Sequence, residues 1–280
     1  MRWSRGAGAG QIEDRRGMGR GAGAVGAGGG LIGLIVLVVS LLGGGGGGGG
    51  LGSMLEQIPA AGGAAPSRTG PVQGESAEFV QAVVGDVQET WTQQFARSKQ
   101  RYEPTVLVLF EQGTSTGCGS ATSAVGPFYC PADRKVYVDL SFFDELRARF
   151  GAPGDFAQAY VIAHEFGHHV QNVLGVNADV QREQQAKPRE ANALSVKLEL
   201  QADCLAGVWA HSAARRDLLE PGDLEEGLGA AAAVGDDRLQ RQAGARVNAE
   251  SWTHGSSADR VKWFRAGFNR GDPADCDTFG

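Results

Sequence analysis

Two histidines and the glutamate between them have residue types and a spacing that could bind a metal ion. They lie in the apolar segment Tyr160-Val-Ile-Ala-His-Glu-Phe-Gly-His-His-Val170. On a helix, residues i and i+4 share one face, so His164 and His168 can offer their imidazoles to the same cation. Glu165 points in another direction, where its carboxylate can reach a water on that cation. The segment therefore predicts a metal site on a helix.

The pattern H-E-x-x-H is typical of zinc hydrolases, in which the glutamate is the general base. A catalytic zinc usually has three protein ligands and a water molecule. We predict Glu199 as the third ligand, because it lies among apolar residues in the helical segment Leu198-Glu-Leu-Gln-Ala-Asp203. Glu190 is the next candidate, and Asp203 follows it. Gln171 and Leu174 stand where the metzincin pattern needs glycine and histidine, which excludes that subclass.

Further residues around this pattern are candidates for supporting roles. Asp203 lies one helical turn after Glu199, where it could accept a hydrogen bond from a ligand imidazole. His254 precedes a helix capped by Ser256, and its ring could stabilise an oxyanion in the reaction, although a surface histidine in a turn is an equal alternative. His169 and His211 are expected to be structural. Gly167 disfavours the helix that contains it, so we expect another backbone to approach there.

The elements that must position these residues follow from hydrophobic periodicity. We predict a helix over 76–100, strands over 104–110 and 134–140, and a short helix that starts with a capping box at Ser141 and Asp144. The motif helix covers about 155–174 and a further helix covers 190–212. Two shorter helices and a last one from about Ser256 complete the chain. This order predicts an α+β fold, with a small sheet packed on one side by the motif helix.

Charge and hydropathy divide the 280-residue chain into segments. The net charge is −6, and the first thirty residues contain five arginines and only two acidic residues, so the remaining body is strongly acidic. An acidic body argues against a nucleic-acid partner. Residues 21–42 are uncharged and end in a strongly apolar run, which predicts a membrane anchor, with a cleaved signal peptide as the alternative.

The positive-inside rule predicts that residues 1–20 stay in the cytoplasm. Residues 43–74 are rich in glycine, alanine, proline and serine and are typical of a flexible tether. The folded domain is expected over 75–280, outside the cytoplasm, on a protein that crosses the cell membrane once.

The four cysteines agree with this location. Cys118 and Cys130 bracket a loop rich in glycine and serine, and Cys204 and Cys276 remain as a second possible pair. An even number of cysteines in an extracytoplasmic domain predicts two disulfide bonds. Free buried thiols are the alternative, and Cys204 is the first candidate for one because it lies in a helical pattern.

Together, these motifs resemble the bacterial family of neutral zinc metallopeptidases over about 75–280. The resemblance implies a zincin-like metallopeptidase domain, in which a small β-sheet packs against a mostly helical body. In zinc peptidases of this architecture an edge strand upstream of the motif helix binds the peptide, and residues 136–140 are the candidate. The segments that carry the resemblance are Cys118-Gly-Ser-Ala, Val125-Gly-Pro-Phe-Tyr-Cys-Pro131, Val136-Tyr-Val-Asp-Leu140, His164-Glu-Phe-Gly-His-His-Val-Gln171, Glu199-Leu-Gln-Ala-Asp-Cys-Leu-Ala-Gly207 and Thr253-His-Gly-Ser256.

The sequence thus predicts a membrane-anchored enzyme that hydrolyses peptide bonds in a peptide or protein substrate. Zn²⁺ held by His164, His168 and Glu199 would activate a water, and Glu165 would act as general base. One alternative is a deformylase-like amidase with Cys118 as the third ligand. Another is a non-catalytic envelope scaffold whose zinc has four protein ligands and no water.

Overall fold

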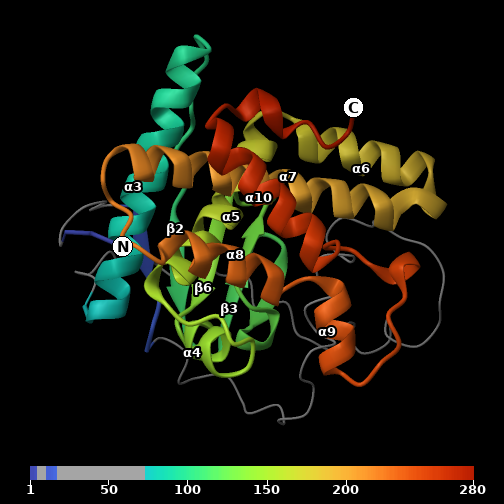
Figure 1. The fold of residues 1–280 in the computed structure, drawn as a ribbon, viewed down its shortest axis with the longest axis horizontal. Coiled ribbons are helices and arrows are strands. Elements are labelled where there is room, and N and C mark those ends of the chain that lie inside the picture. Colours follow the sequence, from blue (N-terminus) through green and yellow to red (C-terminus); the bar gives the residue numbers. More distant parts are fainter. Residues whose placement is uncertain (5–10, 18–72) are drawn as a thin grey trace.

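The computed structural model describes residues 1–4, 11–17 and 73–280. Its fold is α+β, as predicted, with a small sheet packed against a mostly helical body (Figure 1). The predicted anchor at 21–42 and nearly all of the predicted tether lie outside the described residues. Among the residues that are described, none of the helices combines the length and the apolar character needed to cross a membrane.

The main sheet has four strands in the order β1-β2-β6-β5. Its centre is β2 (Leu107–Phe110), an apolar run buried along its whole length, as expected for a strand covered on both faces. β6 (Lys135–Asp139) runs parallel to β2, and β5 (Phe128–Cys130) pairs antiparallel with β6. A separate hairpin consists of β3 (Gly113–Thr116) and β4 (Gly119–Thr122).

This strand order corrects the prediction that residues 136–140 form an edge strand. β6 forms hydrogen bonds with β2 on one side and with β5 on the other. A substrate strand therefore cannot pair with it. The edge next to β6 is instead β5, a three-residue strand too short to be recognised from its sequence pattern.

The opposite edge of the sheet is formed by β1 (Ile12–Asp14), which runs parallel to β2 with Ile12 opposite Leu107. This differs from the predicted domain boundary at residue 75, because residues 12–14 belong to the sheet of the domain itself. The sequence pattern did not indicate the strand, since it comprises three residues in an arginine-rich segment far from its partner.

The helical body agrees well with the predicted elements. α4 begins at Ser141 as expected, but its cap differs, because the Asp139 carboxylate accepts the Ser141 N–H at 2.9 Å in place of a Ser141–Asp144 capping box. α6 was not predicted, since only three of its residues are buried. In chain order the helices are α3 (Glu75–Arg97), α4 (Ser141–Ala148), α5 (Asp155–Val173), α6 (Val176–Ala186), α7 (Ala191–Arg215), α8 (Asp223–Ala233), α9 (Asp236–Gln242) and α10 (Ser257–Arg270).

Glycines allow three helices to pack with their backbones in close contact. A Cβ at Gly167 of α5 would lie 2.9 Å from the Ala202 carbonyl oxygen of α7, which confirms the expected backbone approach. α10 lies across α7 (Figure 1), and a Cβ at Gly267 would lie 1.9 Å from the Cys204 carbonyl oxygen. α7 therefore packs between α5 and α10 so closely that a side chain at Gly167 or Gly267 would clash with the α7 backbone.

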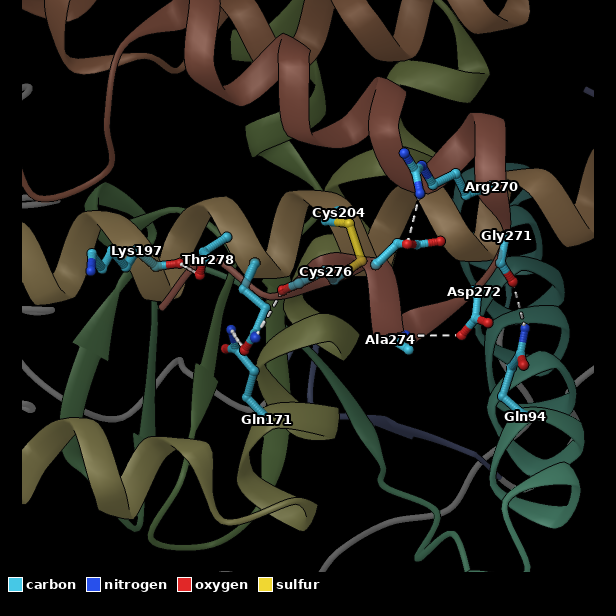
Figure 2. The surroundings of a disulfide bond; sticks show 12 residues. Gln94, Gln171, Lys197, Cys204, Arg270, Gly271, Asp272, Ala274, Cys276 and Thr278 are labelled. Carbon is cyan, nitrogen blue, oxygen red and sulfur yellow. Dashed lines mark hydrogen bonds and ion pairs between the residues drawn. A yellow bond between two sulfur atoms is a disulfide. The ribbon is translucent and has the colours of Figure 1, made fainter. Parts of the chain in front are cut away.

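Both predicted cysteine pairs are disulfide bonds in the structure, Cys118–Cys130 and Cys204–Cys276. Figure 2 shows the second bond joining α7 to the C-terminal segment. Nearby, the Thr278 hydroxyl donates a hydrogen bond to the Lys197 carbonyl at 2.7 Å. The segment after α10 is thus attached to α7 at two points, Cys204 and Lys197.

The contact between α5 and α7 generates a stability prediction. Replacing Gly167 with alanine should lower the free energy of unfolding by about 1–3 kcal/mol, because the new methyl group would press on the α7 backbone. Gly229→Ala in α8 is the matched control, since a Cβ added there would meet no atom of a neighbouring element within 4 Å. That control should be neutral or stabilising by up to about 1 kcal/mol. Equal urea-unfolding midpoints for the two variants would contradict the prediction.

Candidate metal centre

Three of the predicted ligands meet between α5 and α7. His164 and His168 lie one turn apart on α5 with perpendicular rings, and Glu199 faces them from α7. The Nε2 atom of His164 lies 3.1 Å from Glu199 Oε2, and that of His168 lies 3.4 Å from Glu199 Oε1. The three donor atoms all lie within 4.8 Å of one another. The close backbone contact at Gly167 brings α7 near enough for this meeting.

The spacing of these donors fits a zinc ion. Two metal–ligand bonds of about 2.0–2.1 Å at a tetrahedral angle place their donors roughly 3.4 Å apart. The distances from the imidazoles to Glu199, 3.1 and 3.4 Å, agree with that separation. Two imidazole nitrogens and a carboxylate are also a ligand set that zinc accepts. Glu190, the next candidate, is exposed in a 3₁₀ turn outside this group.

Hydrogen bonds on the far side of each imidazole hold its ring in place. The Nδ1 atom of His164 lies 2.9 Å from Asp203 Oδ1, as predicted, and that of His168 lies 2.8 Å from the side-chain oxygen of Gln171. Both oxygens are acceptors, so each Nδ1 carries a proton, and each Nε2 is the nitrogen that could bind a metal once its own proton is displaced. Gln171 was not predicted for this role, although its position three residues after His168 places it on the same helix face.

The Asp203 carboxylate is itself bound by two residues that sequence analysis did not identify. Arg260 of α10 donates to it through Nε at 2.7 Å and through Nη2 at 3.0 Å, and the Tyr160 hydroxyl donates at 2.5 Å. Burial alone would raise the pKa of Asp203, but Arg260 and His164 outweigh this and hold it below its ordinary value. Asp203 is therefore a buried anion fixed against His164.

The Glu165 side chain is buried, yet no described residue donates a hydrogen bond to its carboxylate. Among the described residues, neither of its oxygens is both fully enclosed and without a partner. The carboxylate therefore still reaches solvent. Burial raises the pKa of Glu165 above its ordinary value. A carboxylate in this state can bind a water molecule and accept a proton from it.

The carboxylates of the metal-free centre favour positive charge on the neighbouring imidazoles. Burial would lower the pKa of His164, but Asp203 and Glu199 outweigh it and raise that pKa to about 10. Burial would raise the pKa of Glu199, but His168 and His164 hold it well below its ordinary value. A cation that binds through His164 must displace a proton, so metal affinity should rise with pH.

His254, a candidate for oxyanion stabilisation, lies in the loop before α10. Its Nδ1 atom lies 3.3 Å from Asp236 Oδ1, and Asp236 Oδ2 accepts the N–H groups of Thr253, His254 and Gly255 at 2.6–2.9 Å. Hydrogen bonds from His254 and these amides keep the pKa of Asp236 low although burial raises it. The His254 ring is close enough to Glu199 to lower the pKa of that carboxyl. His254 is thus a buried, oriented residue beside the centre.

The other two histidines have structural contacts, as expected. His169 lies between the Tyr129 hydroxyl, 3.2 Å from Nδ1, and the Glu103 carbonyl, 2.7 Å from Nε2. His211 places Nδ1 2.7 Å from the Phe268 carbonyl of α10. Neither belongs to the group of donors around Glu199.

With this geometry established, comparison with known proteins identifies the family. The model of the family described as "Putative neutral zinc metallopeptidase" matches residues 1–279. The chain belongs to this family. Membership confirms the resemblance noted from the sequence, assigns the α+β fold to a zincin-like metallopeptidase domain, and implies zinc as the cofactor.

Two relatives illustrate how far the similarity extends. "Uncharacterized protein YpfJ" of Escherichia coli K12 is 53% identical over 211 residues, which cover 75% of this chain and 74% of the relative. "Uncharacterized protein Rv2575" of Mycobacterium tuberculosis H37Rv is 51% identical over 182 residues, 61% of each chain. No solved structure matches the chain.

The buried pair of Arg260 and Asp203 generates the second prediction. Arg260→Met should destabilise the metal-free protein by about 3–5 kcal/mol, because it leaves the Asp203 anion buried without its partner. Arg265→Met is the control on the same helix, since Arg265 is exposed, and it should change stability by less than about 0.5 kcal/mol. Urea unfolding in the presence of chelator measures both. Similar losses from the two variants would show that the buried pair has no special role.

Proposed function

We propose that this protein is a peptidase whose zinc ion is bound by His164, His168 and Glu199. The observation that carries the proposal is the convergence of two imidazole Nε2 atoms on one carboxylate, with the unpaired Glu165 beside them. The described residues offer three ligands at this point, whereas a purely structural zinc has four. This favours a catalytic centre over a scaffold. The disulfide at Cys118 argues against the deformylase-like alternative, because that sulfur is not a free thiolate.

The roles in peptide hydrolysis follow from where each side chain lies. Bound zinc would supply Lewis acidity, which lowers the pKa of water toward about 7 and polarises a carbonyl group. Glu165 would accept a proton from the attacking water and deliver it to the leaving amine. Asp203 and Gln171 would keep the two imidazoles oriented through their Nδ1 atoms.

His254 would stabilise the negative charge that develops on the carbonyl oxygen. Asp236 holds the ring in place beside Nδ1, and the Thr253 hydroxyl 3.0 Å from Nδ1 can donate a hydrogen bond to it, so that the ring carries its proton on Nε2 and can donate from there to the oxyanion. No described residue forms a hydrogen bond with this Nε2, and it is not enclosed, so it remains available to substrate.

We propose that a substrate peptide binds as an added strand beside β5, and not beside residues 136–140 as the sequence predicted. β5 has a partner only on its β6 side within the main sheet, and it lies next to α5 through the contact between Tyr129 and His169. An extended peptide could pair with its free edge through main-chain hydrogen bonds. Pro127 and Pro131 flank the strand and limit how far such pairing could extend.

We further propose that the domain works outside the cytoplasm and is attached to the cell membrane through residues 21–42. The two disulfide bonds support an oxidising location, because such bonds are rare in the cytosol. The apolar composition of 31–42 supports a membrane contact.

The assignment of the general base predicts a separation between metal binding and catalysis. Glu165→Gln should retain one zinc per chain but lose at least about 100-fold in kcat/KM on a peptide library, because the amide cannot accept the proton. The double variant His164→Ala/His168→Ala should lose the zinc itself. Metal content and initial cleavage rates measured on the same samples, with chelated wild type as the baseline, test this. Full activity of Glu165→Gln would refute the assignment.

The pairing of His254 with Asp236 predicts a shared effect. His254→Ala should lower kcat by about 100-fold with little change in KM, as expected when one donor to an oxyanion is removed. Asp236→Asn should lower kcat in the same direction, and adding it to His254→Ala should have no further effect, because Asp236 acts through the ring. Independent, multiplicative losses in the double variant would contradict this coupling. Unchanged zinc content in each variant serves as the control.

A further inference from the structure

The N-terminal segment, residues 11–17, forms part of the domain and is not explained by the proposed function. Ile12, Glu13 and Asp14 pair in parallel with residues 107–109. Two backbone hydrogen bonds extend the pairing, from Leu107 N to the Gln11 carbonyl at 3.0 Å and from Arg15 N to the Leu109 carbonyl at 2.8 Å. The Ile12 side chain is buried in the main core. The segment therefore covers the open edge of the central strand.

The charges of this segment are matched to the body of the domain. The buried Glu13 carboxylate accepts from Lys135 Nζ of β6 at 2.7 Å and from Arg15 Nε at 2.9 Å. Burial would raise the pKa of Glu13, but these two cations outweigh it and lower the pKa. If the segment separated from the domain, Glu13 would lose its partner Lys135. This ion pair therefore favours the docked position of the segment.

Contacts on either side of the strand reinforce the attachment. The Trp3 ring packs edge-to-face on Phe79 of α3 with 5.7 Å between centroids. Arg16 is paired with Asp14 at 2.6 Å and also donates to the Gln73 carbonyl at 2.9 Å, where the described chain resumes. Arg15 and Arg16 thus have carboxylate partners within the fold, which weakens their value as a signal for a cytoplasmic flank.

This attachment constrains how the chain meets a membrane. Two strands can pair only when both lie in the same compartment. A single crossing between residues 17 and 73 would place β1 and β2 on opposite sides of the bilayer. We propose that residues 1–4 and 11–17, which include β1, are a built-in part of the catalytic domain and lie on the same side of the membrane as residues 73–280. The predicted cytoplasmic segment and single crossing are then incorrect, whichever way 21–42 contacts the lipid.

Thiol labelling of the full-length chain tests the sidedness. All four native cysteines are in disulfide bonds, so an added cysteine is the only free thiol. Ser4→Cys reports on the described residues 1–4 that precede β1, and Ser98→Cys reports on the rest of the domain, since both serines are exposed. A membrane-impermeant maleimide is applied to bacterial spheroplasts before and after lysis. We expect the two sites to be labelled to the same extent under each condition.

The outcomes of this experiment separate the two proposals. Labelling of both sites in intact spheroplasts supports a shared extracytoplasmic side, and protection of both until lysis supports a shared side while contradicting the proposed location. Labelling of one site with protection of the other would overturn the inference. The peptidase activity of the wild type is measured separately and does not depend on the labelling result.

Thermal unfolding tests whether the strand belongs to its own chain. Glu13→Gln and Lys135→Met should each lower Tm by about 6 °C or more, and the double variant should lose much less than the sum. Glu103→Gln is the control, because its ion pair with Arg134 is exposed, and it should shift Tm by about 1 °C at most. Additive shifts, or no effect of Glu13→Gln, would show that the segment is undocked. A Tm that rises with protein concentration would instead assign the strand to a second copy and overturn the inference.

Discussion

The close crossing of α5 and α7 is the constraint on which the metal centre depends. The ligands come from two separate helices, and they meet only because Gly167 lets the α5 backbone reach the carbonyl of Ala202. On the other side of α7, Gly267 allows α10 an equally close approach to Cys204. The donor positions are therefore determined by contacts between rigid helix backbones, which is how a site keeps its geometry before a metal binds.

The balance of charge at this crossing explains why a cation is favoured. Three buried acidic side chains, Glu165, Glu199 and Asp203, lie around two imidazoles, and Arg260 is a permanent cation bound to Asp203. Burying an unpaired carboxylate is costly. The charge of Asp203 is compensated by Arg260, and that of Glu199 by the imidazoles of His164 and His168. The high pKa of His164, about 10, reflects how much positive charge the centre accepts in the absence of metal.

Local spacing made much of the centre predictable from the sequence. His164, Glu165 and His168 follow from helical periodicity, and Glu199 stood out as an acid among apolar residues. Gln171 could have been found by the same periodicity, since it lies on the face of His168. Arg260 and Asp236 could not, because they reach the centre from elements far along the chain and carry no local pattern. The identity of the edge strand also depended on distant pairing, since β1 and β5 are both three residues long.

The contribution of α10 to the centre has a consequence for biosynthesis. Arg260, which holds Asp203 in place, and Cys276, which ties the chain to α7, both follow the H-E-x-x-H motif by roughly a hundred residues. A nascent chain that has emerged only as far as α7 already contains the three candidate ligands His164, His168 and Glu199, but it still lacks the guanidinium beside Asp203. The complete set of contacts around Asp203 can therefore form only after translation has passed α10.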